Sequence, residues 1–451
     1  MRIAQTKPLF AWDCLEDSPS LKTIRDLLAA LPDGALLESL RSARGKGRND
    51  YPVTVLWGVV VLTIALRHQS TEACLAELKR NEALRRLIGI ESEEGVPSKW
   101  NLSRFEETLG SEPHRTHLKV MFQKMVERLG EAVPDLGRDT AGDATGLSAR
   151  RGRSARSAQD EADLPQASGG CKEYRDADGN ITHIVEWFGY KLHLLVDVKH
   201  EVALSYEITD AKAGDGETLP AVLKQAQAAL PEGRIKTLAY DKAADINEVH
   251  AVLHEAGIEP LIQMRALWNS EPERRLPGHD GNSNIVYDEA GTLYCYDQVS
   301  TPIVRHPMAD IGHEPSRGTI KYRCPARHAG WECPMSRVCN AGKSYGLTVR
   351  VKREIDLRRF PPIPRATRKF ERLYQGRTAV ERVNGRLKVF WGADDGNITG
   401  ARRFHAKVAT VLIVHAAVAT LLAATPRREG TLGKMNLSPI AKELQKKLDA
   451  A

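Results

Sequence analysis

The chain has 451 residues, which is too long for one ordinary domain and predicts two or three. Apolar residues make up 42% of it and charged residues 27%, a balance that excludes a largely disordered chain and is typical of a globular protein. The formal net charge of +7, from 65 Lys and Arg against 58 Asp and Glu, permits a polyanionic partner without requiring one.

The N-terminal region carries the apolar spacing of helices. Such spacing runs through residues 20–40, 53–69 and 70–87, and a further helix reaches Leu129. The pattern predicts a helical domain over residues 1–132. Six basic residues are spread along it, and their charge alone fits either a solvated face or DNA contact: Lys79, Arg80, Arg85, Arg86, Lys99 and Arg104.

From residue 133 to 264 the pattern changes to alternating strands and helices. A short segment with Asp139 and Asp143 is strand-like, and the polar stretch 149–170 has the composition of a loop. The expected elements that follow are strands at 181–198 and 202–208, a helix at 219–230, a strand at 235–240, a helix at 246–256 and a strand at 259–263. This order predicts an α/β fold with an RNase H-like core, a mixed sheet flanked by helices.

An insertion at residues 265–364 interrupts this core and contains Cys295, Cys324, Cys333 and Cys339. Four thiolates can complete a tetrahedral structural zinc site, with His313 or His328 as possible replacements for one ligand. The alternative is a set of reduced cysteines without metal. The core resumes at 365–425 with helical patterning, and a tail follows at 426–451.

A helix in the resumed core carries an unusual set of polar residues. Tyr374, Arg377, Glu381 and Lys388 lie at offsets of 0, 3, 7 and 14 residues. On a continuous α-helix these positions share a stripe roughly 60° wide. A carboxylate flanked by cations suits a metal ion together with DNA phosphates, although local ion pairs on an exposed helix would give the same composition.

The spacing Y-(2)-R-(3)-E-(6)-K resembles the signature of bacterial insertion-sequence transposases with a DDE catalytic domain. The resemblance implies that Glu381 is the third catalytic carboxylate. Asp241, which follows the strand at 235–240, resembles the second, although Ala243 stands where the family has Gly. The alternative for Asp241 is a helix cap, a role that Asp245 fits better.

The first carboxylate has two candidates. The segment that begins Asp143-Ala-Thr-Gly resembles the family's first-strand element, so Asp143 is favoured, and Asp139 stays open. The element that ends at His193 also resembles the family, with His193 expected to be structural. Three carboxylates suit Mg²⁺ or Mn²⁺, which prefer oxygen ligands.

The resemblance also implies contacts with double-stranded DNA. The residues expected to bind it are Tyr374, Arg377, Lys388, Lys242, Arg382 and Arg386. The segment 350–372 carries nine Lys and Arg against three Asp and Glu and leads into the catalytic helix, so DNA contact is expected there too. In the N-terminal domain, residues 96–105 resemble the region that recognises the terminal inverted repeats.

The expected function is therefore that of a DNA transposase. Hydrolysis would free a 3′-hydroxyl at each element end, and that hydroxyl would attack target DNA. Pairing of two ends implies at least a homodimer. The alternatives are an RNase H-like nuclease or domesticated transposase that cuts without joining, and a DNA-binding protein without activity, which the three carboxylates disfavour.

The expected location is the cytoplasm, on the nucleoid when acting, without a membrane. Residues 1–10 lack the long apolar run of a secretory signal. The apolar stretches 53–66 and 408–424 fall short of the roughly 20 residues that span a bilayer, so both are expected to be buried helices. Seven cysteines in such a chain favour a reducing compartment.

Overall fold

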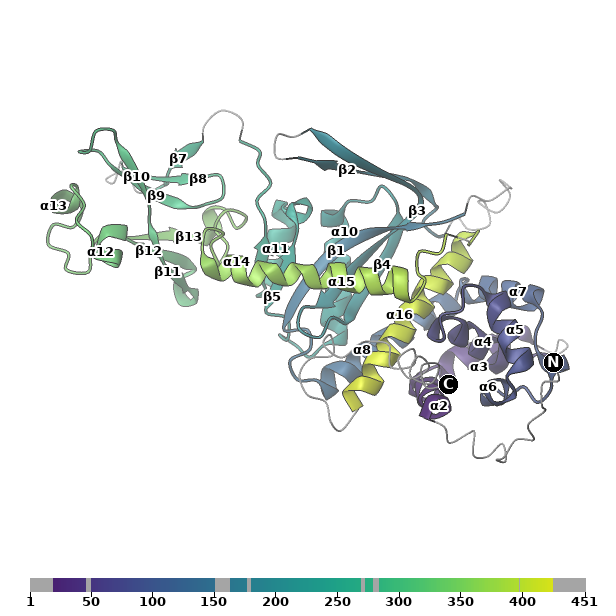
Figure 1. The fold of residues 1–451 in the computed structure, drawn as a ribbon. Helices are drawn as coiled ribbons and strands as arrows, with labels where there is room; N and C mark the ends of the chain where they lie inside the picture. The colour runs from purple at the N-terminus through teal and green to yellow at the C-terminus, as the bar shows by residue number, and fades with distance from the viewer. Residues whose placement is uncertain are drawn as a thin grey trace, which may run out of the picture.

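The computed structural model describes residues 19–45, 50–150, 163–176, 180–268, 272–278, 284–396 and 398–424. Figure 1 shows a helical N-terminal part, a central sheet with helices on both faces, and a β-rich insertion at the opposite end of the molecule. The expected α/β fold with a mixed sheet is confirmed. The expected tail at 426–451 and much of the polar loop at 149–170 lie outside the described residues.

The N-terminal part is helical, as expected. Its helices are α2 (Pro19–Ala30), α3 (Gly34–Arg44), α4 (Val53–Ala65), α5 (Thr71–Arg80), α6 (Glu82–Leu87), α7 (Lys99–Leu109) and α8 (His114–Ala132), with a 3-10 turn η1 (Glu93–Gly95). The expected helix at 20–40 is broken at residues 31–33, which include Pro32. The one at 70–87 is broken at Asn81, whose side chain accepts a hydrogen bond from the Leu84 N–H and begins α6.

The central sheet is built from six strands: β1 (Asp139–Ser148), β2 (Ser168–Arg175), β3 (Ile181–Asp197), β4 (Ala203–Asp210), β5 (Thr237–Tyr240) and β6 (Glu259–Ile262). Their order is β2-β3-β1-β5-β6, and β4 also pairs with β3. β1, β5 and β6 run parallel, whereas β3 is antiparallel to its neighbours. β2 was not predicted, and its first three residues fall in the expected loop 149–170, because its glycines and polar residues hide the strand pattern; it pairs with the exposed half of β3.

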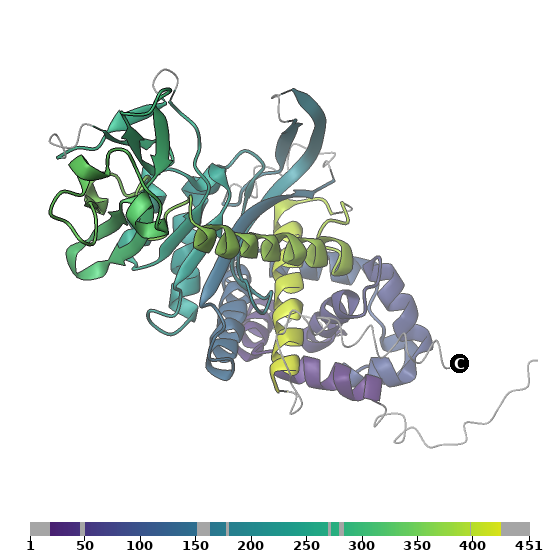
Figure 2. The ribbon, with the colours of Figure 1, turned by 60° about the vertical axis from the view of Figure 1, so that its left-hand side comes forward.

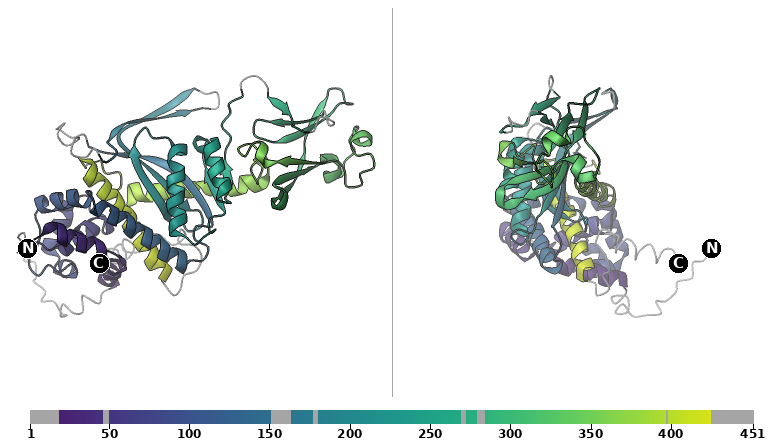
Figure 3. Two further views of the ribbon diagram at one scale, coloured as in Figure 1. Left: turned by 180° about the vertical axis from the view of Figure 1, so that it is seen from behind. Right: turned by 90° about the vertical axis from the view of Figure 1, so that its left-hand side faces the viewer.

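Helices cover both faces of this sheet. α10 (Asp215–Ala229) and α11 (Asn247–Glu255) lie on one face, as the view from behind in Figure 3 shows. The other face is crossed by a helical rod (Figure 2). This rod consists of α14 (Arg368–Tyr374), a 3-10 turn η5 (Gln375–Arg377), α15 (Thr378–Gly385) and a π-helical turn η6 (Arg386–Phe390). The single α-helix expected over 374–388 is therefore three kinds of helix in succession.

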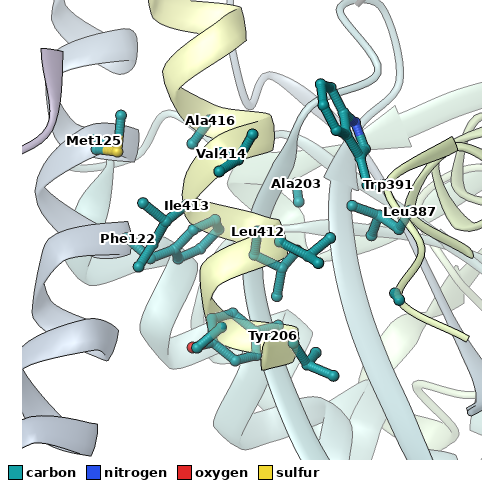
Figure 4. Packing of buried hydrophobic residues seen from close by; sticks show 14 of the residues in the cluster. Phe122, Met125, Ala203, Tyr206, Leu387, Trp391, Leu412, Ile413, Val414 and Ala416 are labelled. Carbon is teal, nitrogen blue, oxygen red and sulfur yellow. The ribbon is translucent and has the colours of Figure 1, made fainter. Parts of the chain in front are cut away.

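The last described helix, α16 (Ala401–Ala424), joins the N-terminal part to the sheet. It packs against α8 on one side and β4 on the other (Figure 4). Phe122 of α8 meets Tyr206 of β4 edge-on, with 5.2 Å between ring centroids. Within the described part of the chain, α16 is the one helix long and apolar enough to cross a membrane, and 72% of its most apolar stretch is buried inside the protein. It is the buried helix that the sequence predicted.

The insertion has its own core. One sheet is formed by β7 (Glu273–Arg275), β8 (Ile285–Asp288), β9 (Leu293–Asp297) and β10 (Val304–Pro307), and a second by β11 (Ala309–Glu314), β12 (Thr319–Arg323) and β13 (Thr348–Lys352). Short turns η3 (Pro315–Arg317), α12 (Pro325–Ala329), α13 (Ser336–Cys339) and η4 (Arg353–Ile355) connect them. Their apolar residues form a cluster separate from the main core.

A buried carboxylate, Asp245, binds both ends of this insertion to the part of the chain that forms the central sheet. Its oxygens accept hydrogen bonds from the Arg265 N–H at 2.7 Å and from Nε of Arg358 at 2.9 Å, and lie 3.4 Å from Arg365. Its other neighbour is the His250 ring, at 2.9 Å. The expectation that Asp245 caps α11 is wrong, because Ile246 precedes that helix and no side chain caps it.

Candidate active site

Two of the three expected carboxylates lie side by side at one edge of the sheet. In the parallel pairing of β1 and β5, Asp139 lies opposite Thr237 and Ala141 opposite Ala239. Two residues further along both strands, the same register brings Asp143 beside Asp241, where β5 ends. Asp143 lies opposite Leu194 of β3 on its other side, so it is held within the sheet.

Asp139 lies at the other end of this pairing. Its Oδ1 accepts a hydrogen bond of 2.8 Å from Oγ1 of Thr237. Four residues of strand, roughly 13 Å, separate it from Asp143. Of the two candidates for the first carboxylate, the structure thus brings Asp143, and not Asp139, to Asp241.

The ring of Tyr240 lies beneath the two aspartates. It packs over Gly142, where a Cβ atom would lie 2.5 Å from the ring, so the position requires glycine. Burial first, and the charges of Asp215, Asp143 and Asp241 second, raise the pKa of Tyr240 well above its ordinary value. Tyr240 therefore stays a neutral, apolar support for the carboxylates.

Asp241 also has a local structural role. Its Oδ1 accepts a hydrogen bond of 2.8 Å from the Ala243 N–H and caps the 3-10 turn η2 (Lys242–Ala244). Lys242 is exposed in that turn. The cap uses one oxygen of Asp241 and leaves the other for a ligand.

The rod brings Glu381 to the aspartates through Arg377. Nη2 of Arg377 donates to Oε1 of Glu381 at 2.5 Å, and Nη1 lies 3.9 Å from Oδ2 of Asp143. Burial disfavours the charge of Arg377, but Tyr374, Glu381, Asp143 and Asp241 together raise its pKa. Glu381 itself is accessible, with 49% of its side chain exposed. The structure therefore gathers Asp143, Asp241 and Glu381 around one guanidinium.

Tyr374 is part of the same group. Its ring stacks on Phe370 at 5.6 Å and is half buried. Burial first raises the pKa of Tyr374, and the nearby charges of Asp241 and Glu381 add to the increase while Arg377 opposes it. Tyr374 thus borders the carboxylates as a neutral hydroxyl.

Lys388 lies in the π-helical turn, further along the rod, and its Nζ is 3.4 Å from Oγ1 of Thr145 on β1. Its Nζ donates to the Gly146 carbonyl at 2.8 Å and pairs with Asp394 at 3.0 Å. Asp394 in turn accepts from the Ser148 N–H at 2.5 Å. In this arrangement Lys388 fastens the end of the rod to β1.

Arg382 of α15 and Arg386 of η6 lie on a different side of the rod from Glu381. Both bind Glu201 in the turn between β3 and β4, Arg382 with Nε at 2.6 Å from Oε1. Glu201 has a φ of +54°, a backbone conformation that is strained for a non-glycine residue. Arg382 and Arg386, which the sequence predicts to bind DNA, therefore also tie the rod to the turn between β3 and β4.

The basic segment 350–372 contains both buried and exposed cations. Arg353 and Arg358 are buried, and the side chain of Arg365 is 7% exposed. The cations that the fold leaves exposed in this segment are Arg350, Lys352, Arg368, Lys369 and Arg372. Only this second group is available to a polyanion.

The four cysteines of the insertion gather around one end of its core. Cys324 is buried and the other three are packed against the same cluster. Burial first, then the proximity of Cys324, Cys333 and Cys339, raises the pKa of Cys295 to about 12. Within the described ranges, no three His, Cys, Asp or Glu side chains lie at metal-ligating distance, here or at the carboxylates.

Two structural residues of the site escaped sequence analysis. Glu201 is an isolated acid in the connection between β3 and β4, Asp394 is the first of two consecutive aspartates, and no spacing marks either of them. Their roles become visible only in the tertiary structure, because each binds an arginine or lysine more than five residues away in the chain. His193, by contrast, behaves as expected: it is 2% exposed, burial lowers its pKa to about 4, and Nε2 contacts Oγ1 of Thr209 at 3.0 Å.

Two family models match the chain. The model of the transposase DDE domain matches residues 143–416, and that of a second transposase domain (DUF772) matches residues 13–108. No match was found among curated proteins. The first match covers more than half of the chain, starts at Asp143 and includes Asp241 and Glu381. Proteins with this domain cut and join DNA and generally use divalent metal ions. The chain therefore belongs to the DDE transposases of insertion sequences.

Proposed function

We propose that Asp143, Asp241 and Glu381 hold the divalent metal ions with which this transposase hydrolyses phosphodiester bonds at the ends of its element. The observation that carries the proposal is the β1–β5 register, which puts Asp143 beside Asp241 at the end where the rod delivers Glu381. Three carboxylates form an oxygen-only donor set, which fits hard ions such as Mg²⁺ or Mn²⁺.

The net charge of the three carboxylates and Arg377 also fits the binding of divalent metal ions. Three carboxylates are gathered around one guanidinium, so two negative charges remain for a ligand to neutralise. When bound, a pair of divalent ions supplies an activated nucleophile and stabilises the charge on the leaving oxygen. Arg377 occupies the space between Glu381 and Asp143 and must give up at least one of these contacts.

In the first step, a water oxygen bonds to phosphorus and the bond from phosphorus to the 3′-oxygen breaks, which leaves a 3′-hydroxyl. In the second step, that hydroxyl attacks a phosphorus of target DNA and displaces another 3′-oxygen. Arg377, once released, binds a phosphate oxygen together with the exposed Lys242. Tyr374 donates its neutral hydroxyl to the DNA. Lys388, Arg382 and Arg386 keep the catalytic helix in place.

The N-terminal domain binds the terminal inverted repeats, and α7 supplies the contact. Trp100 has 73% of its surface exposed, and Arg104, one helical turn later, is exposed on the same side. A large exposed aromatic beside a cation fits a nucleic acid better than an isolated solvated helix. Replacing Trp100 by Ala should weaken binding of inverted-repeat DNA relative to the parent protein.

A strand-transfer assay tests the central proposal. Pre-cleaved element ends, Mg²⁺ and a target plasmid should give joined products with the parent protein and none with Glu381→Gln. Cleavage without any joined product would favour the alternative, a nuclease or domesticated transposase. Because two ends must meet, the active complex is at least a homodimer, and its mass on end DNA checks this.

The cysteines of the insertion suit a structural zinc ion. Two side-chain amides approach their sulfurs, Asn340 Nδ2 at 3.6 Å from Sγ of Cys324 and Asn284 Nδ2 at 3.8 Å from Sγ of Cys339. Such contacts favour the thiolate that zinc requires. One zinc per chain should be measured in the purified protein, and Cys324→Ser should lower that amount. A metal-free, fully stable protein would contradict the assignment.

A further inference from the structure

The three-stranded sheet of the insertion has two different faces. Alternate residues of β12 and β13 are buried in the insertion core: Ile320 is 0% exposed, Tyr322 3%, Val349 0% and Val351 1%. Side chains alternate along a strand, so the residues between them point to the opposite face. That second face is partly open to solvent: Arg350 and Lys352 are exposed, Lys321 and Arg323 are partly exposed, and Thr319 is 6% exposed.

The solvent face carries four cations, Lys321, Arg323, Arg350 and Lys352, which we call the cationic face. The register sets Lys321 directly opposite Arg350. Like charges in that position destabilise a sheet, so folding alone does not account for them. The register also brings one carboxylate to this face, Glu314, which accepts from Nε of Arg350 at 2.8 Å. Four cations against one carboxylate leave an excess of positive charge.

The neighbouring strand leaves this face open. β11 sets Gly312 opposite Lys321 and Ala309 opposite Arg323, and neither side chain is large enough to cover a cation. Tyr345, with 46% of its surface exposed, lies 3.8 Å below the guanidinium of Arg323. Nε of Arg323 donates to the Tyr345 carbonyl at 2.7 Å, which fixes the stacked guanidinium. A held guanidinium on an exposed ring is preorganised to bind a phosphate.

The chain leads from the cationic face to the catalytic rod. It passes from β13 through η4 to α14, which exposes Arg368, Lys369 and Arg372. Lys369 interacts electrostatically with Asp310 of β11, which the register sets opposite Tyr322, on the buried side of the sheet. The exposed cations of α14 therefore form a second basic group, apart from the cationic face.

We propose that the cationic face binds the phosphate backbone of double-stranded DNA outside the catalytic centre. The inference rests on the proposed function, which makes DNA the substrate. Regular phosphates match rows of cations on two strands, and contacts to phosphate position DNA without reading its sequence. The face would thus hold DNA that flanks the reacting bond.

The test measures how binding of a short labelled duplex of arbitrary sequence depends on salt. Lys321→Gln with Lys352→Gln removes two cations and keeps the Arg350–Glu314 and Arg323–Tyr345 contacts. The slope of log affinity against log salt should fall by about 1.8, since each lost phosphate contact changes it by roughly 0.9. The control, Lys224→Gln with Lys236→Gln, removes two exposed lysines of the catalytic domain and should leave the slope unchanged.

A second variant is expected to raise DNA affinity. Misfolding would lower that affinity, so it cannot produce the expected result. Glu314→Gln removes the acid partner of Arg350 and should raise DNA affinity. Equal slopes for the two lysine pairs, or no gain with Glu314→Gln, would overturn the proposal. If the protein cuts and joins DNA but the two lysine-pair variants have equal salt slopes, DNA binding by the cationic face is refuted and the proposed function is not. If the slope falls but no cleavage or joining occurs, the proposed function fails and the cationic face stands.

Discussion

Arg377 donates a hydrogen bond of 2.5 Å to Glu381, four residues later on the same rod. The guanidinium thus neutralises the carboxylate that the proposed reaction needs for metal. It also lies within 3.9 Å of Asp143. An internal cation therefore takes the central position among the three acids, and a metal ion has to compete with it.

Removing this cation should strengthen metal binding by the DNA-free protein. A unit charge about 4 Å from a carboxylate is worth several kcal/mol near a protein surface, so Arg377→Gln should raise Mn²⁺ affinity at least tenfold. Calorimetric titration measures it. Arg372→Gln, a neighbouring exposed cation, is the control. Unchanged Mn²⁺ affinity in Arg377→Gln would show that Arg377 does not compete with metal for the carboxylates.

Each of the three carboxylates should be essential, and Asp139 should not be. Asp143→Asn, Asp241→Asn and Glu381→Gln are expected to lower cleavage of element ends by roughly 10²-fold or more. Asp139→Asn keeps an oxygen for the Thr237 hydroxyl and should retain activity. Gel assays of end cleavage, with DNA binding measured in parallel, check this. An inactive Asp139→Asn that folds normally would reopen the choice of first carboxylate.

Glu201 should matter although it is remote from the reacting bond. Glu201→Gln removes the charge that holds Arg382 and Arg386, and we expect a loss of about 1 kcal/mol of unfolding free energy, because Arg382 is half exposed to solvent. End cleavage should fall as α15 loses its anchor. Glu255→Gln, an exposed acid on α11, is the control and should change neither quantity. Cleavage at the parental rate by Glu201→Gln would show that the contacts of Glu201 with Arg382 and Arg386 are not needed by the active site.

Acid should destabilise the protein through His415. Burial in α16 lowers the pKa of His415 to about 3, and its Nε2 accepts from the Ala203 N–H at 3.3 Å. The unfolded chain binds the proton near pH 6.5, so the stabilisation is complete above that pH and is lost as the pH falls toward 3. At pH 5 the loss amounts to about 2 kcal/mol.

Urea unfolding at pH 7 and pH 5 checks this expectation. His415→Gln keeps an acceptor that does not titrate, so its unfolding free energy should fall less between the two pH values. His254→Gln, at an exposed histidine, should behave like the parent. An equal fall in all three proteins would contradict the role of His415.

How far the sequence predicted the site depended on whether the signal was local. The strand that ends at Asp241 and the spacing of Arg377 and Glu381 are local, and both were found. The choice between Asp143 and Asp139 required the pairing of β1 with β5, which joins residues far apart in the chain. No composition distinguishes two aspartates four positions apart on one strand.

The sequence could not predict where a tertiary partner binds a side chain. Arg358 and Arg365 belong to a basic segment that looked exposed, yet the buried Asp245 draws both inward. Arg382 follows Glu381 directly, but a helix places successive residues on different sides, and Glu201 binds it. Helical spacing also assumed one α-helix, whereas residues 386–390 form a π-helical turn, in which Lys388 contacts β1.

The binding of both insertion ends by Asp245 bears on how such proteins can diversify. Because Arg265 and Arg358 meet at one carboxylate, the two points where the insertion leaves and rejoins the core are neighbours in space. Whatever is built between them can grow, shrink or be exchanged without displacing Glu381. The insertion is in this sense a replaceable module, and its removal, with a short linker across the gap, leaves the geometry of the carboxylates to the core alone.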